Sequence, residues 1–447
     1  MSFIKAWRPN GSSMRILNLV HQYLPERVGG TELYTQAIAR AMVARGHTVG
    51  VFHRSNRDDP GLLYRDEQGA AVWSASAGVM SPGQRFLASH RQAVLHGAFE
   101  TVIETFRPDV VHIQHMMGLP VSIAQLLQRA RIPYVITLWD FWWRCANAQL
   151  LTNDSQQICD GPTRTFLNCA RCAVARAGAS TGAAARLSGG LLRLPALPLV
   201  APLMARRNAL LDAIIRRAAR LLAPTPFVAA WYVRRGFPEE RVVVLPPALA
   251  YPDNITHHGD SGVLRVAYIG GLSAQKGVHV LIEAFAGLHG EAELWVAGDE
   301  SADPGYSRVL RETASPNVRF LGRLDREDVW KTLAQVDVVA VPTLWYETYS
   351  FIISEAFVAG APVLVSRLGP LADRVRDGVD GLLLPPGDVS SWRGALQSLV
   401  DTPGRLGNLR SGVRQPESLT EHAAQLEALL RGVTQELAAP EVTRSAP

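Results

Sequence analysis

One helical stretch between two strands constrains this chain more than any other feature. The residues Glu347–Glu355 lie between two short runs rich in β-branched residues, Val336–Val341 and Pro362–Ser366. Such runs are typical of buried strands, and the segment between them, which ends at Gly360, is typical of a helix. A strand–helix–strand unit places the helix N-terminus at the carboxyl edge of a parallel sheet, where open α/β sheets bind ligands. Glu355 is the only charge in this helix, so we expect a polar partner beside its carboxylate.

The overall composition predicts a globular protein of two domains. The chain has 447 residues, with 47% hydrophobic and 19% charged, which fits a sizeable core. Its formal charge of +5 is dispersed, which favours an anionic substrate or membrane surface over nucleic acid. No apolar run is long enough for a membrane-spanning helix. We expect a cytoplasmic protein without a nucleic-acid partner; peripheral contact at the inner face of the membrane is a further interpretation.

Strand and helix patterns alternate twice along the chain, which predicts an α/β fold of two Rossmann-like, doubly wound domains. The first set of predicted strands comprises Arg15–Val20, Thr48–Phe52, Asp109–His115, Ile132–Leu138, Arg220–Pro224 and Arg241–Pro246. The second set comprises Leu264–Ile269, Ala292–Ala297, Val318–Leu321, Val336–Val341, Pro362–Ser366 and Gly381–Leu384. Helices are expected to begin near Gly277, Gly305, Arg326, Ser350, Pro370 and Ser390 in the second domain.

These patterns divide the chain into successive regions. Residues 1–13 are expected to form a disordered leader, with Met14 as an alternative start. A first domain at 14–250, with a cysteine-containing insertion at about 144–205, is followed by a polar linker at 251–262. A second domain at 263–415, a helix at 416–437 and a disordered tail at 438–447 complete the division.

Two features of the first domain lie at the ends of predicted strands. Gly29 and Gly30 follow the first strand without the full GxGxxG pattern, so the pair either admits a phosphate or sugar or makes a plain turn. On the strand that begins at Asp109, His112 is expected to be a core residue. His115, at the carboxyl end of that strand, is the better candidate for a ligand contact.

All four cysteines lie in one polar stretch. Clustering in a reducing compartment favours metal binding over disulfides, and four thiolates suit tetrahedral zinc. Only one pair has the usual Cys-x-x-Cys spacing, and redox pairs or free thiols are the alternatives. We expect a structural zinc ion, without a part in catalysis, held by Cys145, Cys159, Cys169 and Cys172.

The segment 173–203 is rich in Ala, Gly, Leu and Pro with scattered arginines, and an apolar helix with further arginines follows it. This segment is too short and too rich in proline to span a bilayer. One interpretation is an interfacial segment that touches a membrane. The interpretation we favour is a mobile surface loop followed by an ordinary amphipathic helix.

The second domain opens with a strand that leads into Gly270 and Gly271 and then Lys276. Glycines after a strand, with a lysine at the start of the next helix, suit an anionic diphosphate. Further motifs after the later strands strengthen this signal: Gly298, Arg323, the Glu347–Glu355 pair and the stretch Asp380–Gly387.

Together these motifs resemble a retaining glycosyltransferase of family 4, with the two-Rossmann GT-B architecture, over residues 14–435. The most specific element is the E-x7-E motif of Glu347 and Glu355. The resemblance implies a cleft that closes on a nucleotide-diphosphate sugar, namely a UDP-, GDP- or ADP-sugar. It also implies that Glu355 binds the ribose, Glu347 binds the transferred sugar and Lys276 neutralises the pyrophosphate. Backbone groups would complete the site, from Tyr349, Ser350 and Phe351 on one wall and Gly29 and Gly30 on the other.

The resemblance further implies retention at the anomeric carbon and an acceptor that is a glycan, a lipid-linked molecule or a small molecule. A lysine and a helix dipole can stabilise the departing diphosphate without a metal, and no convincing DxD triplet is present, so we expect no catalytic metal. Two alternatives share the architecture. One is a nucleotide-sugar epimerase or phosphorylase-like enzyme, and the other is a non-catalytic sugar-nucleotide binder.

Three positions depart from the family pattern. Gly271 stands where the family often has arginine, which leaves Lys276 a larger share of the diphosphate charge. Gln114 stands where the family often has a histidine, with our candidate His115 beside it. Trp139 replaces another frequent histidine. The cysteine insertion resembles that of a subset of these transferases.

Overall fold

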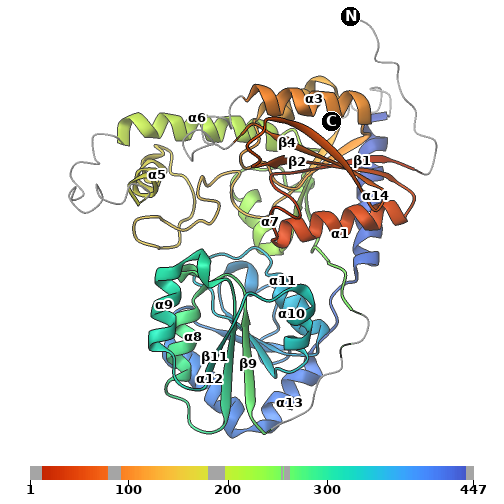
Figure 1. Ribbon diagram of the computed structural model, residues 1–447. Coiled ribbons are helices and arrows are strands. Elements are labelled where there is room, and N and C mark those ends of the chain that lie inside the picture. The colour runs from red at the N-terminus through yellow and green to blue at the C-terminus, as the bar shows by residue number, and fades with distance from the viewer. Residues whose placement is uncertain (1–12, 79–91, 180–196, 253–254, 256–261, 439–447) are drawn as a thin grey trace, which may run out of the picture.

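The computed structural model describes residues 13–78, 92–179, 197–252, 255 and 262–438. The predicted leader and tail therefore lie almost entirely outside the described residues, and most of the predicted linker does too. Within the described part, the chain forms two α/β domains, one above the other in Figure 1, each built on its own sheet. This confirms the predicted fold class of two doubly wound domains.

The first domain contains an eight-stranded sheet in the order β3-β4-β2-β1-β5-β6-β7-β8. Every neighbouring pair is parallel except β3 and β4, which form an edge hairpin. That hairpin turns at Gln68 and Gly69, both at positive φ, without the Asn-Gly or Asp-Gly sequence that marks such turns. The sequence therefore predicted only the other six strands. The strands are β1 (Arg15–Val20), β2 (Thr48–Ser55), β3 (Gly61–Glu67), β4 (Ala70–Ser76), β5 (Val110–Ile113), β6 (Tyr134–Thr137), β7 (Arg220–Ala223) and β8 (Val242–Val244).

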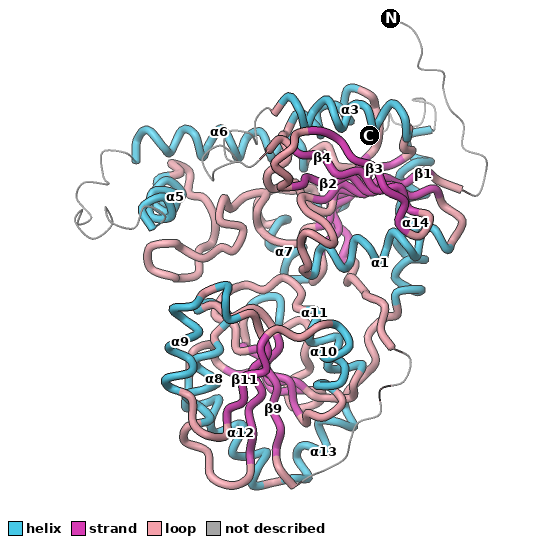
Figure 2. Tube along the Cα trace, viewed as in Figure 1, coloured by secondary structure: helices cyan, strands magenta, loops and turns pink. Residues whose placement is uncertain are grey.

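Helices cover both faces of this sheet and bury two separate apolar clusters (Figure 2). Two further helices, α5 and α6, extend to one side of the sheet and pack against each other. The helices are α1 (Gly30–Ala44), α3 (Ala93–Phe106), α4 (Ser122–Arg129), α5 (Leu167–Ala179), α6 (Leu197–Ile215) and α7 (Pro226–Val233).

The second domain contains six parallel strands in the order β11-β10-β9-β12-β13-β14. This is the Rossmann order, and the connections reverse direction between β9 and β12. The strands are β9 (Leu264–Ile269), β10 (Ala292–Ala297), β11 (Val318–Gly322), β12 (Val338–Val341), β13 (Val363–Ser366) and β14 (Gly381–Leu384). Its helices are α8 (Val278–Phe285), α9 (Pro304–Thr313), α10 (Arg326–Leu333), α11 (Phe351–Val358), α12 (Val389–Asp401) and α13 (Pro403–Gly412).

The helix expected near Pro370 was a wrong prediction. The structure has only the 3-10 turn η5 (Gly369–Leu371) there. The residues that follow continue this turn with i→i−3 backbone hydrogen bonds, such as Arg374 N–H to the Leu371 carbonyl at 3.1 Å, and their side chains fix the segment to distant elements. Asp373 accepts from the backbone N–H of Phe227 at 2.6 Å, and Arg374 donates to backbone carbonyls before α11.

The last helix, α14 (Leu419–Ala438), returns from the second domain and packs on the first (Figure 1). Its apolar side joins the core of α1 through residues that include Leu426 and Leu430. His422 Nε2 lies 2.7 Å from Tyr34 Oη, and Arg45 Nε lies 2.6 Å from a carboxylate oxygen of Glu427. The chain thus crosses between the domains twice. None of the helices described has the length and apolar character that crossing a membrane requires.

Candidate functional site

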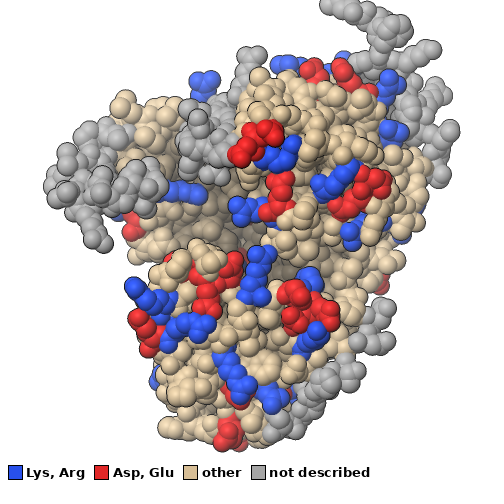
Figure 3. All heavy atoms as spheres, viewed as in Figure 1, with Lys and Arg blue, Asp and Glu red and all other residues tan. Residues whose placement is uncertain are grey.

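The carboxyl edge of the second sheet faces the first domain, and Figure 3 shows a hollow between the two halves with charged side chains at its rim. The N-termini of α1 and α11 meet at this junction. A Cβ on Gly30 would lie 3.0 Å from the Phe351 ring, and the Thr348 hydroxyl donates to the carbonyl of Trp139. Two helix N-termini pointed at one space favour a ligand with negative charge.

Lys276 and Glu347 form the most distinct charged pair at this edge. Lys276 Nζ lies 2.7 Å from Oε1 and 2.8 Å from Oε2 of Glu347, and 5.4 Å from the Trp345 ring centroid. The backbone after the lysine is tightly constrained, because Gly277 has φ +73 and an added Cβ would lie 1.9 Å from the Pro342 carbonyl oxygen. The lysine is therefore held against the end of β12, and the structure brings together two residues that the sequence placed far apart.

Glu355 is buried, with 5% of its surface exposed, and its partner is Arg326. Arg326 Nη1 donates to the Glu355 carboxylate at 2.6 Å. The sequence indicated that this carboxylate needed a polar partner but did not identify which one. Arg326 is the first residue of α10, and only its position after β11 could have suggested it.

Arg374 organises the backbone between Glu347 and Glu355. Its guanidinium donates to the carbonyls of Tyr349 and Ser350 at 2.6 and 3.1 Å and to the Ser354 hydroxyl at 2.7 Å. Its carbon Cζ also lies 3.6 Å from the Tyr349 ring centroid. These contacts hold Ser350 at φ +62 directly before α11. Burial lowers the pKa of Arg374. No motif in the sequence pointed to this residue.

The other residues predicted in the second domain have different surroundings. Gly298 packs so closely on the neighbouring loop that a Cβ would lie 2.3 Å from the Gly270 carbonyl oxygen. Gly271 faces open space. Arg323 is largely exposed, and its guanidinium lies 4.0 Å from Asp299. In the described structure it makes no contact with the Lys276–Glu347 pair.

On the first domain, His115 lies in a chain of polar side chains. Its Nδ1 accepts from the backbone N–H of Met117 at 3.2 Å, so the proton lies on Nε2, which faces Asp140 Oδ2 at 3.1 Å. The His115 and His21 ring centroids are 4.5 Å apart, and His21 Nε2 lies 4.0 Å from Glu32 Oε1. Glu32 is in the first turn of α1. The sequence identified only His115 in this chain of side chains.

Burial shifts the pKa of two members of this polar chain, His21 and Glu32. It lowers the pKa of His21 well below its usual value, with smaller contributions from His115 and Arg54. Burial also raises the pKa of Glu32. His112 is a buried core residue, as predicted, and its Nε2 lies 2.7 Å from Thr137 Oγ1.

The four cysteines line a single cavity of about 820 Å³ in the first domain, and none forms a disulfide. Backbone N–H groups of Gly161 and Asn153 donate to the sulfurs of Cys159 and Cys172, each at 3.4 Å. Burial and the three neighbouring cysteines raise the pKa of Cys169 to about 12. In the described part of the chain, however, no three His, Cys, Asp or Glu side chains are arranged to hold a metal ion. The sulfurs share one cavity but would have to move closer to bind zinc.

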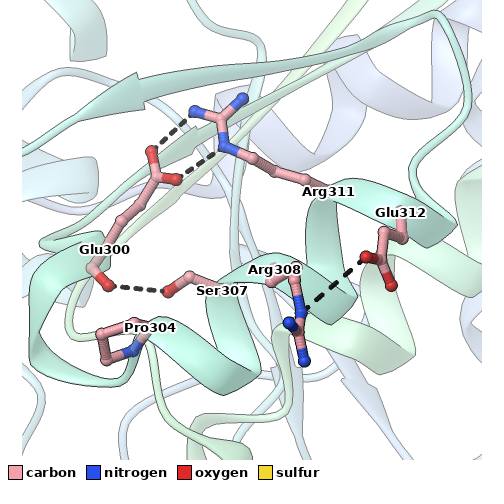
Figure 4. A pocket seen from close by; sticks show the side chains of 6 residues that line it. All are labelled: Glu300, Pro304, Ser307, Arg308, Arg311 and Glu312. Carbon is pink, nitrogen blue, oxygen red and sulfur yellow. Dashed lines mark hydrogen bonds and ion pairs between the residues drawn. The ribbon is translucent and has the colours of Figure 1, made fainter.

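A second hollow lies on the outer surface of α9 and is unrelated to this site (Figure 4). Its charges pair with one another. Arg311 donates to Glu300 at 2.6 and 2.7 Å, and Arg308 lies 3.8 Å from Glu312. We therefore assign no ligand to it.

Two doubly wound α/β domains that face each other form the GT-B architecture of glycosyltransferases. A family model described as "Glycosyl transferase 4-like domain" matches residues 29–248, and one described as "Glycosyl transferases group 1" matches residues 264–402. The chain belongs to the family 4 glycosyltransferases.

Curated relatives match over a limited stretch. A D-inositol 3-phosphate glycosyltransferase of Corynebacterium kroppenstedtii is 31% identical over 171 residues, which is 36% of this chain and 36% of that protein. A glycogen synthase of Mycobacterium tuberculosis is 30% identical over 164 residues, or 35% of this chain and 38% of that protein. The alignments thus span little more than a third of these relatives.

Solved structures match over nearly the whole chain and share the fold. A sucrose-phosphate synthase from Thermosynechococcus elongatus has a TM-score of 0.66 at 17% identity and covers 94% of this chain and 99% of its own. The Anabaena protein HepE, in complex with UDP and glucose, has a TM-score of 0.63 at 18% identity and covers 94% and 100%. Starch synthase IV of Arabidopsis thaliana, bound to ADP and acarbose, has a TM-score of 0.60 at 13% identity and covers 95% and 100%.

Proposed function

We propose that this chain is a retaining glycosyltransferase that transfers a sugar from a nucleotide-diphosphate sugar to a glycan, lipid-linked or small-molecule acceptor. The observation that carries this proposal is the Lys276–Glu347 pair beside the N-terminus of α11. A departing nucleotide diphosphate develops negative charge. The ammonium and the helix N-terminus together can stabilise that charge without a metal at the reaction centre.

Donor binding would rearrange the two ion pairs found at the site. The diphosphate would attract Lys276 and free the Glu347 carboxylate to accept hydrogen bonds from hydroxyls of the transferred sugar. The ribose hydroxyls would donate to Glu355, which Arg326 now neutralises. Arg374 adds a further positive charge beneath the start of α11. The support comes from the chemistry of these groups and from UDP or ADP in the related structures.

His115 remains our proposed residue on the acceptor side. With its proton on Nε2 toward Asp140, the ring is fixed in one tautomer and one orientation. Gly29 and Gly30 would form the wall opposite α11, because a side chain at Gly30 would meet the Phe351 ring.

Two further proposals concern the insertion. A structural zinc ion held by the four cysteines is supported by their shared cavity and by backbone N–H groups directed at two of the sulfurs. Peripheral contact at the inner face of the membrane is supported by Leu199 and Leu203 of α6, which are 76% and 51% exposed.

A donor screen tests the proposed function. We expect a UDP-, GDP- or ADP-sugar to raise the melting temperature, because a ligand that binds only the folded state stabilises it. The product formed with that donor should keep the anomeric configuration by NMR. Inversion would overturn the retaining mechanism. Conversion of the donor itself, without transfer, would favour the epimerase, and stabilisation without any turnover would favour a sugar-nucleotide binder.

A further inference from the structure

The cavity of about 820 Å³ begins at the carboxyl edge of the first sheet and extends along the insertion. Its inner end is formed by His21, directly after β1, and by Met117 and Gly118 after β5. Its outer walls come from α5 and α6. Because the His21 ring packs on His115, the inner end lies beside the proposed reaction centre. A volume of this size is typical of sites for organic ligands and exceeds what a single metal ion requires.

The outer wall of the cavity is apolar and continues onto the surface. Val200, Leu203 and Met204 of α6 line it, together with Ala173 and Val174 of α5. Leu203 is both a lining residue and 51% exposed. One turn earlier, Leu199 is 76% exposed. An apolar ligand chain could therefore pass from the protein surface into the cavity along one helix face.

The charges on the cavity all have one sign. Arg54, Arg176 and Arg207 line it, and no Asp or Glu occurs among its described lining residues. Arg207 is 6% exposed, donates to the Trp142 carbonyl at 2.7 Å and lies 4.9 Å from the Trp142 ring centroid. Within the described residues, neither Arg176 nor Arg207 has a carboxylate within ion-pair distance. A buried guanidinium without a carboxylate is costly unless an anion neutralises it.

The sequence of the insertion and of α6 shows the same bias. Residues 161–211 contain no Asp or Glu at all. The same stretch contains the arginines Arg164, Arg171, Arg176, Arg186, Arg193, Arg206 and Arg207. Apart from Arg171, which pairs with Asp154, these arginines give the stretch a net positive charge, and such a charge favours an anionic partner. Arginine suits phosphate in particular, because its planar donors match phosphate oxygens.

From this combination of an apolar wall and two arginines without a carboxylate partner among the described residues, Arg176 and Arg207, we propose that the cavity binds the acceptor as a phosphorylated lipid. The apolar chain lies along Leu203 and Met204 toward the surface of α6, and the phosphate faces the arginines. The part that receives the sugar then lies toward His21 and the donor. This inference rests on the proposed transferase function and defines its acceptor class. It does not require zinc, which would only close the wall formed by the cysteines.

Binding of dodecyl phosphate to the full-length protein tests the proposal, with thermal stabilisation and equilibrium binding as readouts. We expect dodecyl phosphate, below its critical micelle concentration, to bind at least about tenfold more tightly than inorganic phosphate or dodecyl maltoside. Only dodecyl phosphate has both an apolar chain for the apolar wall and a phosphate for the arginines. Equal binding of inorganic phosphate would mean that the site takes a free phosphate, and equal binding of dodecyl maltoside would mean that the arginines take no part. Either result would overturn the proposal.

Matched variants locate the binding site. Leu203→Glu and Arg176→Gln should each weaken dodecyl phosphate binding by about tenfold. Leu63→Glu on β3 and Arg171→Gln on α5 are changes of the same kind at exposed positions outside the cavity, and they should leave the binding unchanged. Equal losses in the control variants would overturn the assignment to the cavity. If nucleotide sugars stabilise the protein and dodecyl phosphate does not bind, this inference fails and the transferase proposal stands. If no nucleotide sugar binds, the transferase proposal fails on its own.

Discussion

The ammonium of Lys276 lies between both carboxylate oxygens of Glu347, at 2.7 and 2.8 Å, although the two residues are 71 positions apart in the sequence. Both side chains are largely but not fully buried, with 24% and 19% exposed. A pair in this position is poised to exchange partners. An arriving diphosphate competes for the lysine, and hydroxyls of the donor sugar compete for the carboxylate.

Lys276→Ala and Glu347→Gln should therefore each reduce kcat by roughly 100-fold to 1000-fold, as loss of one electrostatic group at a reacting centre does in other enzymes. Turnover with the identified donor and the melting temperature should be measured together. Lys331→Ala is the matched control, because Lys331 forms exposed pairs with Glu327 and Asp328 on α10. Near-normal turnover in either site variant would contradict the roles we assign.

Glu355→Gln should act mainly on donor binding. The ribose is remote from the bond that breaks, so its contacts contribute about equally to the ground state and the transition state. We expect KM for the donor to rise about tenfold with kcat changed much less. Glu327→Gln, on the exposed face of α10, is the control. A fall in kcat without a change in KM would place Glu355 at the reacting centre instead.

Arg374→Met should destabilise the start of α11. The variant removes donors to two backbone carbonyls and to the Ser354 hydroxyl, and these acceptors would remain buried without their present partner. The expected loss is about 2–4 kcal/mol in the free energy of unfolding by urea titration. Arg374→Lys should retain the charge but lose the forked geometry, so it should recover only part of the stability. Full recovery by lysine would show that the charge alone matters.

The alternation of strands and helices in the sequence predicted both sheets, because buried parallel strands are short β-branched runs that need no tertiary information to recognise. The β3–β4 hairpin was missed, since Gln68-Gly69 is a weak turn signal. The helix expected near Pro370 was wrong because long-range contacts, and no local signal, decide the structure of that segment. Side chains of Asp373 and Arg374 hold that segment in place, and such contacts depend on elements distant in the sequence.

In the candidate site, too, the residues in local motifs were predicted and those that depend on long-range contacts were not. Glu347, Glu355 and Lys276 belong to local motifs and were found from them. Arg326 and Arg374 were not, because each meets its partner only after folding. A lone buried carboxylate indicates that a partner exists, but the sequence alone does not show which residue lies close to it in space.

Acid should loosen α14 from the first domain. Burial lowers the pKa of His422 to about 4, and its ring contacts Tyr34 of α1. The pKa of a histidine in an unfolded chain is about 6.5. Below that pH the unfolded state binds the proton more readily, so stability falls as the pH drops toward 4, by up to about 1.4 kcal/mol per pH unit. Melting temperatures of wild type and His422→Gln between pH 7 and pH 4 check this. The variant should have the smaller slope, and identical slopes would exclude His422 as the cause.

The cysteine cavity gives the last prediction. Zinc requires thiolates, yet burial raises the pKa of Cys145, Cys169 and Cys172 in the metal-free arrangement. Binding would therefore release protons and draw the sulfurs together. Elemental analysis of protein purified without chelators should find about one zinc ion per chain, and Cys169→Ser should lower that content. Removing the metal with a chelator should lower the melting temperature while the donor still binds, because the second domain contains none of the cysteines. Metal-free, fully folded protein with four titratable thiols would contradict the zinc proposal and leave the cysteines as free thiols.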